Sequence, residues 1–320
     1  MLGADTVVSS SSCSGFTALA YRSHLRQRTH VQQQSTLDQG LRCPICVLAL
    51  HLHSEPGAGA RLACANGHRF DAAKQGYFNL LTGKGTNFKE DGADMVAARA
   101  SFLDAGHYES LAEALGHRVR TALRHEENPR ILDAGAGTGY YLRQVLAALP
   151  STQEATAVAL DISRYAMRRA AKVPDTLALV WDLWRDLPID DESFDLLLNI
   201  FSPHNGTEFA RVLRPGGTAL VVTPLPEHLA EGAELLGLLG IAEDKAAGVV
   251  SSMGEGFTLR ATEEVLIPLV LGETPAFELA MMGPAGHHLN AQVLRDKLSG
   301  ENTPVLLTAA FRIQEFRRND

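Results

Sequence analysis

Three cysteines and one histidine near the amino terminus have the spacing of a metal site. They form a C-x2-C pair and, after 17 intervening residues, a C-x3-H pair: Cys43, Cys46, Cys64 and His68. Three thiolates and one imidazole suit a tetrahedral Zn²⁺ ion. A stretch of about 50 residues cannot bury a large core, so a metal would stabilise it. We predict structural zinc here, with His51 and His53, inside the loop, as weaker candidates for the fourth ligand.

A glycine-rich turn is the second stretch that could do chemistry. An apolar run ends at Asp133, and Gly135, Gly137 and Gly139 follow at alternate positions. Glycines let a ligand approach the backbone, and N–H groups at a helix start can face it. Asp161 ends the next apolar run, where an acid can accept hydrogen bonds from ribose hydroxyls. The spacing is not that of a nicotinamide-binding turn, and there is no Walker A lysine.

Strand and helix patterns alternate from Arg130 onward, which predicts a doubly wound α/β fold. We expect strands at 131–134, 156–160, 176–180, 194–200 and 218–223, and an antiparallel edge pair from 258–271 and 305–316. Expected helices span 140–149, 163–172, 206–213 and 227–239, with interrupted helical spacing at 276–289. Two further helices, 93–103 and 108–124, precede the first strand.

Composition sets limits on the class of protein. The chain has 320 residues, 45% of them hydrophobic, and a net charge of −8, as expected for a globular protein without a coat of basic surface. No apolar run is long enough to span a membrane. Four cysteines, three of them clustered, fit an intracellular metal site better than a disulfide framework. Residues 1–40 lack a hydrophobic period, so we expect a disordered extension in which Cys13 has no role.

The stretch 41–90 differs in charge from the rest of the chain. Six basic side chains outnumber three acidic ones: Arg42, Arg61, Arg69, Lys74, Lys84 and Lys89 against Glu55, Asp71 and Glu90. Interleaved aromatic residues, Phe70, Tyr77, Phe78 and Phe88, could stack on bases. For Phe70 and Phe78 we favour the alternative that they form the small core of the stretch.

Residues 126–320 resemble the class I S-adenosylmethionine-dependent methyltransferases, through the glycine turn, Asp161 and the Val-Leu-Arg-Pro-Gly-Gly stretch at 212–217. When residues 41–90, called the zinc stretch below, are included, the resemblance narrows to the RlmA family of 23S rRNA guanine-N1 methyltransferases. It covers the chain from about residue 41 and rests on these further stretches in order: Lys-Gln-Gly-Tyr-Phe-Asn-Leu-Leu at 74–81, Phe-Leu-Asp-Ala-Gly-His-Tyr at 102–108, Ile-Phe-Ser-Pro at 200–203 and Thr-Pro-Leu-Pro-Glu-His-Leu at 223–229.

The resemblance implies a Rossmann-like, doubly wound seven-stranded sheet with a small N-terminal zinc-ribbon-like module. It implies these units: a zinc-binding RNA-recognition module at 41–90, a helical linker at 91–125 and the methyltransferase domain at 126–320. It implies that S-adenosylmethionine is contacted by a set of residues from the turn and its neighbours: Tyr108, Asp133, Gly135, Gly137, Gly139, Tyr140, Asp161, Asp182 and His228.

The same resemblance implies the substrate and setting. The target would be a guanine in the helix 35 hairpin of 23S rRNA, at position 748 rather than 745, because the composition suits the actinomycete branch that confers macrolide resistance. A cytoplasmic homodimer is implied as well. Loss of zinc should then impair RNA methylation and leave cofactor affinity mostly intact.

The catalytic group is left open by the sequence. Guanine N1 carries a proton that must leave, so a general base would help. Asn199 lies at the end of the strand where the target base should lie; it can hydrogen-bond the base but is a poor proton acceptor. His204, just beyond it, is a candidate base, with a plain loop histidine as the alternative. Two other functions compete: a small-molecule methyltransferase with a structural zinc module, and an RNA-binding protein that no longer turns over.

Overall fold

The computed structural model describes residues 39–55, 58–83, 85–240, 245–299 and 304–320. The extension expected at 1–40 therefore lies, apart from its last two residues, outside the described part of the chain, as do Cys13 and Lys84. Within the described part, no helix has both the length and the apolarity to cross a membrane.

The core of the fold is one mixed sheet with the order β10-β11-β9-β8-β5-β6-β7-β4. Its strands are β4 (Phe78–Asn79), β5 (Arg130–Ala134), β6 (Thr156–Asp161), β7 (Thr176–Val180), β8 (Phe194–Ile200), β9 (Leu213–Pro224), β10 (Phe257–Leu271) and β11 (Val305–Arg318). The class I methyltransferase fold is confirmed, including the antiparallel hairpin β10–β11, which pairs with β9 at one edge. The expected number of seven strands is wrong by one, because β4 joins the other edge parallel to β7.

The two faces of the sheet bury separate cores, because side chains of each strand alternate between them. One face packs under α2 (Ala93–Asp104), α3 (Glu109–Ala122), α4 (Tyr140–Ala148), α5 (Arg164–Ala170) and α9 (Glu273–Met282). The other face packs under α6 (Gly206–Val212) and α8 (Lys245–Met253). The second core also contains the buried side chains of the zinc stretch, among them Leu50, Leu62 and Phe70.

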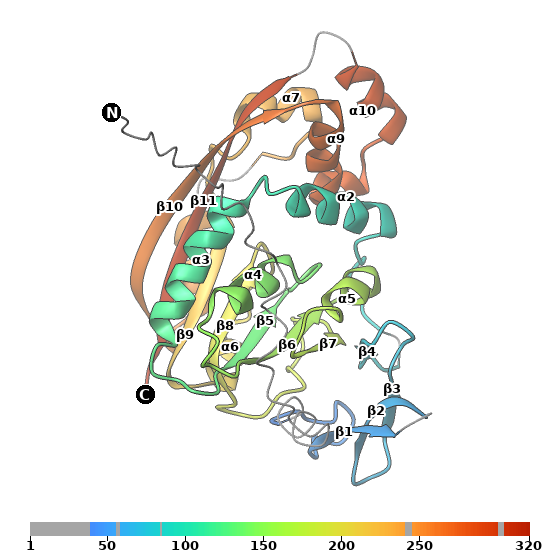
Figure 1. The fold of residues 1–320 in the computed structure, drawn as a ribbon, viewed down its shortest axis with the longest axis vertical. Helices are drawn as coiled ribbons and strands as arrows, with labels where there is room; N and C mark the ends of the chain where they lie inside the picture. Colours follow the sequence, from blue (N-terminus) through green and yellow to red (C-terminus); the bar gives the residue numbers. More distant parts are fainter. Residues whose placement is uncertain (1–38, 56–57, 84, 241–244, 300–303) are drawn as a thin grey trace, which may run out of the picture.

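The zinc stretch thus covers part of the sheet itself. It folds as a small antiparallel sheet of β1 (Leu50–Glu55), β2 (Ala58–Cys64) and β3 (Arg69–Asp71). It lies below β4 and β7 in the view of Figure 1. The chain between β7 and β8 holds no helix, and Leu41 and Arg42 pair with this segment at Ile189 and Pro188. Phe70 and Phe78 are 8% and 2% exposed, so both are core residues, as favoured above.

Two predicted helical segments differ from the expectation. The helix expected at 227–239 is wrong: it is only a 3₁₀ turn (Ala230–Gly232) and the short α7 (Ala233–Leu236). The backbone of Leu229 and Gly237 has positive φ, which ends helical structure on both sides. The helices expected at 91–125 are present as α2 and α3, but they pack on α9 and on α4, so they form part of the sheet's covering layer. Short helices η3 (Pro284–His287) and α10 (Ala291–Leu298) complete the fold.

Candidate functional site

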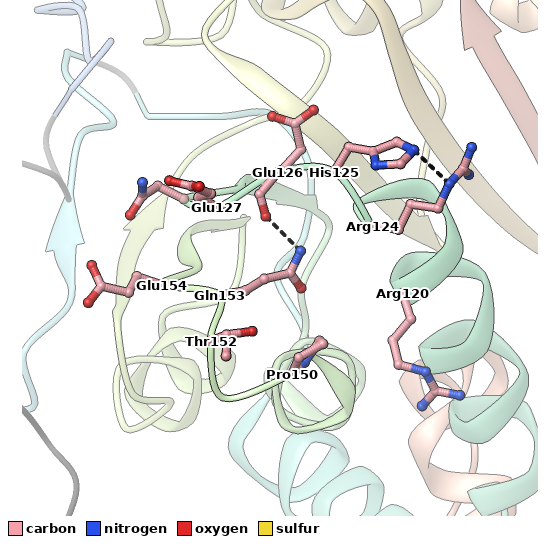
Figure 2. A pocket seen from close by; sticks show the side chains of 10 residues that line it. Arg120, Arg124, His125, Glu126, Glu127, Pro150, Thr152, Gln153 and Glu154 are labelled. Carbon is pink, nitrogen blue, oxygen red and sulfur yellow. Dashed lines mark hydrogen bonds between the residues drawn. The ribbon is translucent and has the colours of Figure 1, made fainter.

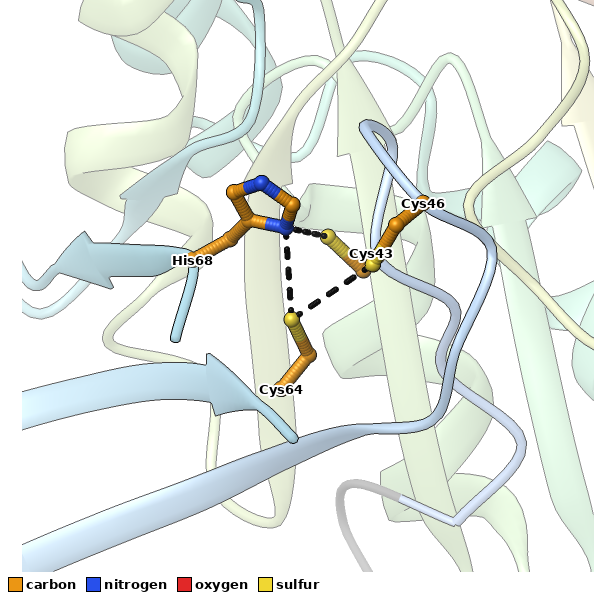
Figure 3. Close-up of side chains that lie close together, drawn as sticks. All are labelled: Cys43, Cys46, Cys64 and His68. Carbon is orange, nitrogen blue, oxygen red and sulfur yellow. Dashed lines mark hydrogen bonds between the residues drawn. The ribbon is translucent and has the colours of Figure 1, made fainter. Parts of the chain in front are cut away.

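The four candidate zinc ligands form one cluster, shown in Figure 3. The Sγ atoms of Cys43 and Cys64 lie 3.5 and 3.4 Å from His68 Nδ1, and those of Cys46 and Cys64 lie 3.6 Å apart. A tetrahedral Zn²⁺ with ordinary Zn–S and Zn–N bonds keeps its ligand atoms roughly 3.5–3.8 Å apart. The donor set and its spacing therefore fit zinc. His51 and His53 do not belong to the cluster.

Hydrogen bonds within the cluster favour the ionised form of one of its thiols, Cys64. Burial opposes ionisation of the Cys64 thiol, but hydrogen bonds from the His68 and Asn66 backbone and from the Cys46 and His68 side chains outweigh it and lower its pKa to about 6. Burial raises the pKa of Cys43. One thiol is thus ready to bind as a thiolate, which is the form that ligates metal.

The glycine turn follows β5 at the carboxyl edge of the sheet, where ligands of open α/β sheets bind. All three glycines have positive φ, at 92°, 54° and 76° for Gly135, Gly137 and Gly139. A side chain at Gly135 would overlap Ser202, and one at Gly139 would lie 3.0 Å from Ala170 Cα of α5. Only Gly137 has open space in front of it, so it is the position where a ligand can approach the backbone.

Two buried carboxylates flank the turn. Asp161, at the end of β6, accepts hydrogen bonds from the Gly137 N–H at 2.9 Å and the Ser163 N–H at 2.8 Å. Burial raises its pKa against these hydrogen bonds. Asp133 is 2% exposed, burial and then the charge of Asp161 raise its pKa to about 8, and its Oδ1 has no partner among the described residues. Asp161 thus holds the turn in shape, and Asp133 keeps a carboxyl oxygen without a described partner.

Asp182 extends the row of acids to the end of β7, as the sequence places it. Its Oδ2 accepts a hydrogen bond from the Thr86 hydroxyl at 2.8 Å, and its Oδ1 accepts one from the Trp184 N–H at 3.0 Å. Thr86 belongs to the segment that leads from β4 to α2. That segment also bonds the start of α5, through Glu90 to Arg164 and the Asp91 carbonyl to Ser163 Oγ.

The aromatic residues of the site form a connected cluster around Phe311 of β11. Its ring lies 4.9 Å from that of Tyr108, 4.7 Å from His228 and 5.1 Å from Phe201. Tyr141 contacts Phe201 at 6.1 Å and Tyr140 at 5.0 Å. The cluster therefore brings Tyr108 and His228, which are far from the turn in sequence, to the same side as Tyr140.

Several polar atoms in this cluster are buried without a protein partner. The hydroxyls of Tyr108 and Tyr141 have no hydrogen bond with any described residue. Burial raises the pKa of both tyrosines, so both keep their protons at neutral pH. Burial lowers the pKa of His228 to about 4, so its ring is neutral. Free hydroxyls, a carboxyl oxygen without a partner and an open glycine fit a ligand with both donors and acceptors, as S-adenosylmethionine has.

Asn199 and His204 form a defined pair at the end of β8. The Asn199 Nδ2 lies within 3.0 Å of the Ala134 and Pro203 carbonyl oxygens, which can only accept. The amide orientation is fixed by these contacts, so Oδ1 faces His204 Nδ1 at 2.7 Å and accepts a hydrogen bond from its N–H. Burial lowers the pKa of His204. The neutral ring therefore carries its proton on Nδ1 and leaves Nε2 as a proton acceptor.

Phe201 lies between Asn199 and His204 in the chain and has an unusual backbone conformation. Its φ is 55°, a left-handed value that is strained for a bulky residue, and its side chain is 44% exposed. An exposed aromatic ring held by strain at the carboxyl end of a central strand is a platform on which a planar ligand can stack.

A surface hollow of about 610 Å³ lies elsewhere (Figure 2). It is lined by the end of α3 and the turn before β6, including Arg124, Glu127 and Gln153. These residues precede β5 and β6, so the hollow is at the amino edge of the sheet. It contains none of the residues predicted to bind cofactor or zinc.

Sequence reasoning missed three residues of this site: Arg99, Tyr141 and Phe201. Tyr141 and Phe201 lie inside the stretches that carried the resemblance, so their aromatic type was a usable signal. Arg99 lies in α2, where the sequence pattern does not mark any polar residue as part of a site. Its side chain comes close to the turn only because α2 packs over it. Sequence spacing gave no signal for it.

The fold and the site define a class I S-adenosylmethionine-dependent methyltransferase that carries a zinc ribbon. Residues 131–217 match the model of a methyltransferase domain, and residues 41–84 match the model of the N-terminal zinc ribbon of RlmA. The match to the zinc ribbon includes all four clustered ligands.

Curated relatives narrow the class to one family. A Micromonospora griseorubida protein provisionally named a 23S rRNA (guanine-N1)-methyltransferase is 40% identical over 87% of this chain and 97% of its own length. The 23S rRNA (guanine(748)-N1)-methyltransferase of Streptomyces fradiae is 38% identical over 81% of this chain and 90% of its own length. The chain belongs to the RlmA-type family of 23S rRNA (guanine-N1)-methyltransferases.

Proposed function

We propose that the chain methylates N1 of a guanine in the helix 35 hairpin of 23S rRNA, at position 748, in the cytoplasm where that RNA resides. The carrying observation is a zinc ribbon that covers the methyltransferase sheet and continues directly into the rim of the candidate cofactor site at Thr86 and Asp182. The position is supported by the name of the Streptomyces fradiae relative, which specifies guanine 748.

The cofactor residues proposed are those predicted from the sequence, now grouped by position. Gly137 leaves room for the ligand, Asp161 is placed for the ribose, and Asp182 for the adenine. Asp133 would contact the ligand through its Oδ1, which has no partner among the described residues. Tyr108, Tyr140 and His228 line the aromatic side, and Gly135 and Gly139 shape the turn by packing against Ser202 and α5. These roles are supported by the placement of the residues along one edge of the sheet.

We propose His204 as the proton acceptor and Phe201 as the stacking platform for the target base. S-adenosylmethionine, when bound, supplies an electrophilic methyl group. Guanine N1 would gain that methyl group as its bond to the sulfonium sulfur breaks, with S-adenosylhomocysteine as the leaving group. N1 would lose its proton to His204 Nε2, which would then release it to water. A base in a hairpin loop leaves its stack at lower cost than one in a duplex. Asn199 is a positioning residue, since it acts by fixing the His204 tautomer.

The test uses the purified full-length protein with two hairpin RNAs. One carries guanine at position 748 and the other carries adenosine there with guanine 745 retained. Methylated nucleosides are identified by mass spectrometry after digestion. We expect N1-methylguanosine from the first RNA only. Methylation of the second RNA would move the target to 745, and transfer to metabolites without RNA would support the small-molecule alternative.

Two further properties are proposed with this function. Methylation at position 748 would confer resistance to tylosin-type macrolides, and the family resemblance implies a homodimer. Expression in a sensitive host that lacks the gene should raise the inhibitory macrolide concentration, and the His204→Gln variant should not. Sedimentation of the purified protein measures the oligomeric state directly.

A further inference from the structure

Arg99 of α2 lies directly over the open glycine of the turn. A Cβ added to Gly137 would have Arg99 Nη1 at 3.9 Å as its nearest neighbour, and no other described side chain or backbone atom would lie within 4 Å of it. The guanidinium and the Gly137 backbone therefore lie next to one another, so a ligand group at the turn can contact both.

The other end of the guanidinium is held in place. Arg99 Nη2 forms an ion pair with Asp91 Oδ2 at 2.6 Å and donates a hydrogen bond to the Met282 carbonyl at 2.5 Å. Asp91 is also 3.2 Å from His287 Nε2. The segment before α2 and the end of α9 thus fix Nη2, while Nη1 donates no hydrogen bond to a described residue.

Near Arg99, the second carboxyl group is already engaged and one hydroxyl donor is spare. Asp161 is engaged by the turn, and its pKa is raised by burial while the charge of Arg99 partly opposes that rise. The Tyr141 hydroxyl is buried, has no partner among the described residues and feels the charge of Arg99. A cation and a hydroxyl donor in one place suit a small carboxylate.

We propose that Arg99 Nη1 anchors the carboxylate of the methionine part of S-adenosylmethionine, with the Tyr141 hydroxyl as a second donor. The adenosine part carries no anion, so a cation that faces the turn recognises the amino-acid end of the cofactor. This inference rests on the proposal that the turn binds S-adenosylmethionine. It makes Arg99 a specificity residue for the whole cofactor over analogues without the carboxylate.

The test compares calorimetric binding of S-adenosylmethionine and decarboxylated S-adenosylmethionine. We expect the wild-type protein to bind the decarboxylated compound roughly 10- to 100-fold more weakly, the range that one charged hydrogen bond accounts for. Arg99→Met should weaken binding of S-adenosylmethionine by a similar factor and bind both compounds about equally. Arg99→Lys, which keeps the charge, should fall between.

The matched control is Arg312→Met. The Arg312 side chain is 23% exposed and pairs with one carboxylate, Glu264, at 2.7 Å, while that of Arg99 is 24% exposed. Arg312 lies on the β10–β11 hairpin, so its loss should leave both affinities unchanged. Equal binding of the two compounds by the wild-type protein would overturn the proposal even if Arg99→Met failed to fold.

Two other outcomes separate this inference from the proposed function. If Arg99→Met kept the wild-type preference and only lost affinity for RNA, Arg99 would contact a phosphate and the carboxylate anchor would be wrong. RNA methylation by the wild-type protein would still stand in that case. If the wild-type protein bound no S-adenosylmethionine at all, the proposed function itself would fail.

Discussion

At the scale of single residues, the site depends on groups whose state is set by their neighbours. Asn199 is fully buried and its Nδ2 donates hydrogen bonds to backbone carbonyl oxygens, so it cannot also bind the target base. Its effect is to decide which nitrogen of His204 carries the proton. The sequence suggested Asn199 as a hydrogen-bond partner of the target base and His204 as a candidate base. It could not show that Asn199 acts on His204 instead, because that depends on which amide atom faces the histidine.

The role of His204 leads to a prediction about pH. Because burial lowers the pKa of His204 from its ordinary value of about 6.5, the ring is neutral at pH 7 and gains a proton only in more acidic solution. The single-turnover methylation rate should therefore be flat near neutrality and fall as pH decreases, with a midpoint below about 6.5. His204→Gln should lower the rate by roughly 10²- to 10⁴-fold and remove this acid limb.

The control for this prediction is His125→Gln, because His125 is exposed at the opposite edge of the sheet. It should keep the wild-type rate and the wild-type pH profile. Calorimetry should show that His204→Gln binds S-adenosylmethionine within about twofold of the wild-type affinity, a difference below 0.5 kcal/mol. An unchanged acid limb in His204→Gln would assign the titration to another group.

At the scale of elements, most of the sheet was predictable because its strands are apolar runs bounded by Gly, Pro or Asp. All five expected parallel-type strands and both edge strands are present within a few residues of the predicted bounds. β4 could not be found in this way, since a two-residue strand has no period. The docking of the zinc ribbon was also hidden, because it follows from the missing helix between β7 and β8, and only the folded chain shows which segment covers that face.

This arrangement changes the prediction for loss of zinc. The sequence suggested separable modules, but the ribbon shares a core with the sheet and continues through β4 to Thr86 and Asp182. Cys64→Ser should therefore lower the melting temperature of the whole protein by at least about 5 °C in one transition. It should also weaken cofactor binding, because Asp182 loses its support.

Differential scanning calorimetry with and without a zinc chelator measures this directly. Ser193→Ala is a useful control, because Ser193 lies in the same region of the sheet edge but away from the cluster, with its hydroxyl bonded only to the Asp190 and Asp191 backbone. Two separate transitions, with the upper one unchanged by the chelator, would show that the modules fold independently and would restore the simpler expectation.

At the scale of the whole molecule, the charge is unevenly distributed: basic side chains gather in one part of a chain whose net charge is negative. The net charge is −8, yet the zinc stretch carries exposed basic side chains at Arg69, Lys74 and Lys89. Arg42 is not among them, since it pairs with Asp190 and Asp191. An acidic protein that binds RNA must concentrate its cations at the contact, because long-range repulsion otherwise slows association.

The last prediction concerns the salt dependence of RNA binding. If Arg69, Lys74 and Lys89 contact phosphates, replacing all three by Ala should weaken hairpin binding and reduce the slope of log K against log salt by about 2 to 3, one counterion per lost contact. The comparison is a triple variant of exposed arginines away from the zinc stretch, Arg120→Ala, Arg124→Ala and Arg260→Ala, which makes the same change in net charge. Both variants shift the overall charge equally, so only a local contact can separate their slopes. Fluorescence anisotropy of the labelled hairpin at several salt concentrations gives the affinity and the salt slope of each variant. Equal slopes would mean that the zinc ribbon stabilises the fold of the enzyme and does not contact the RNA phosphates.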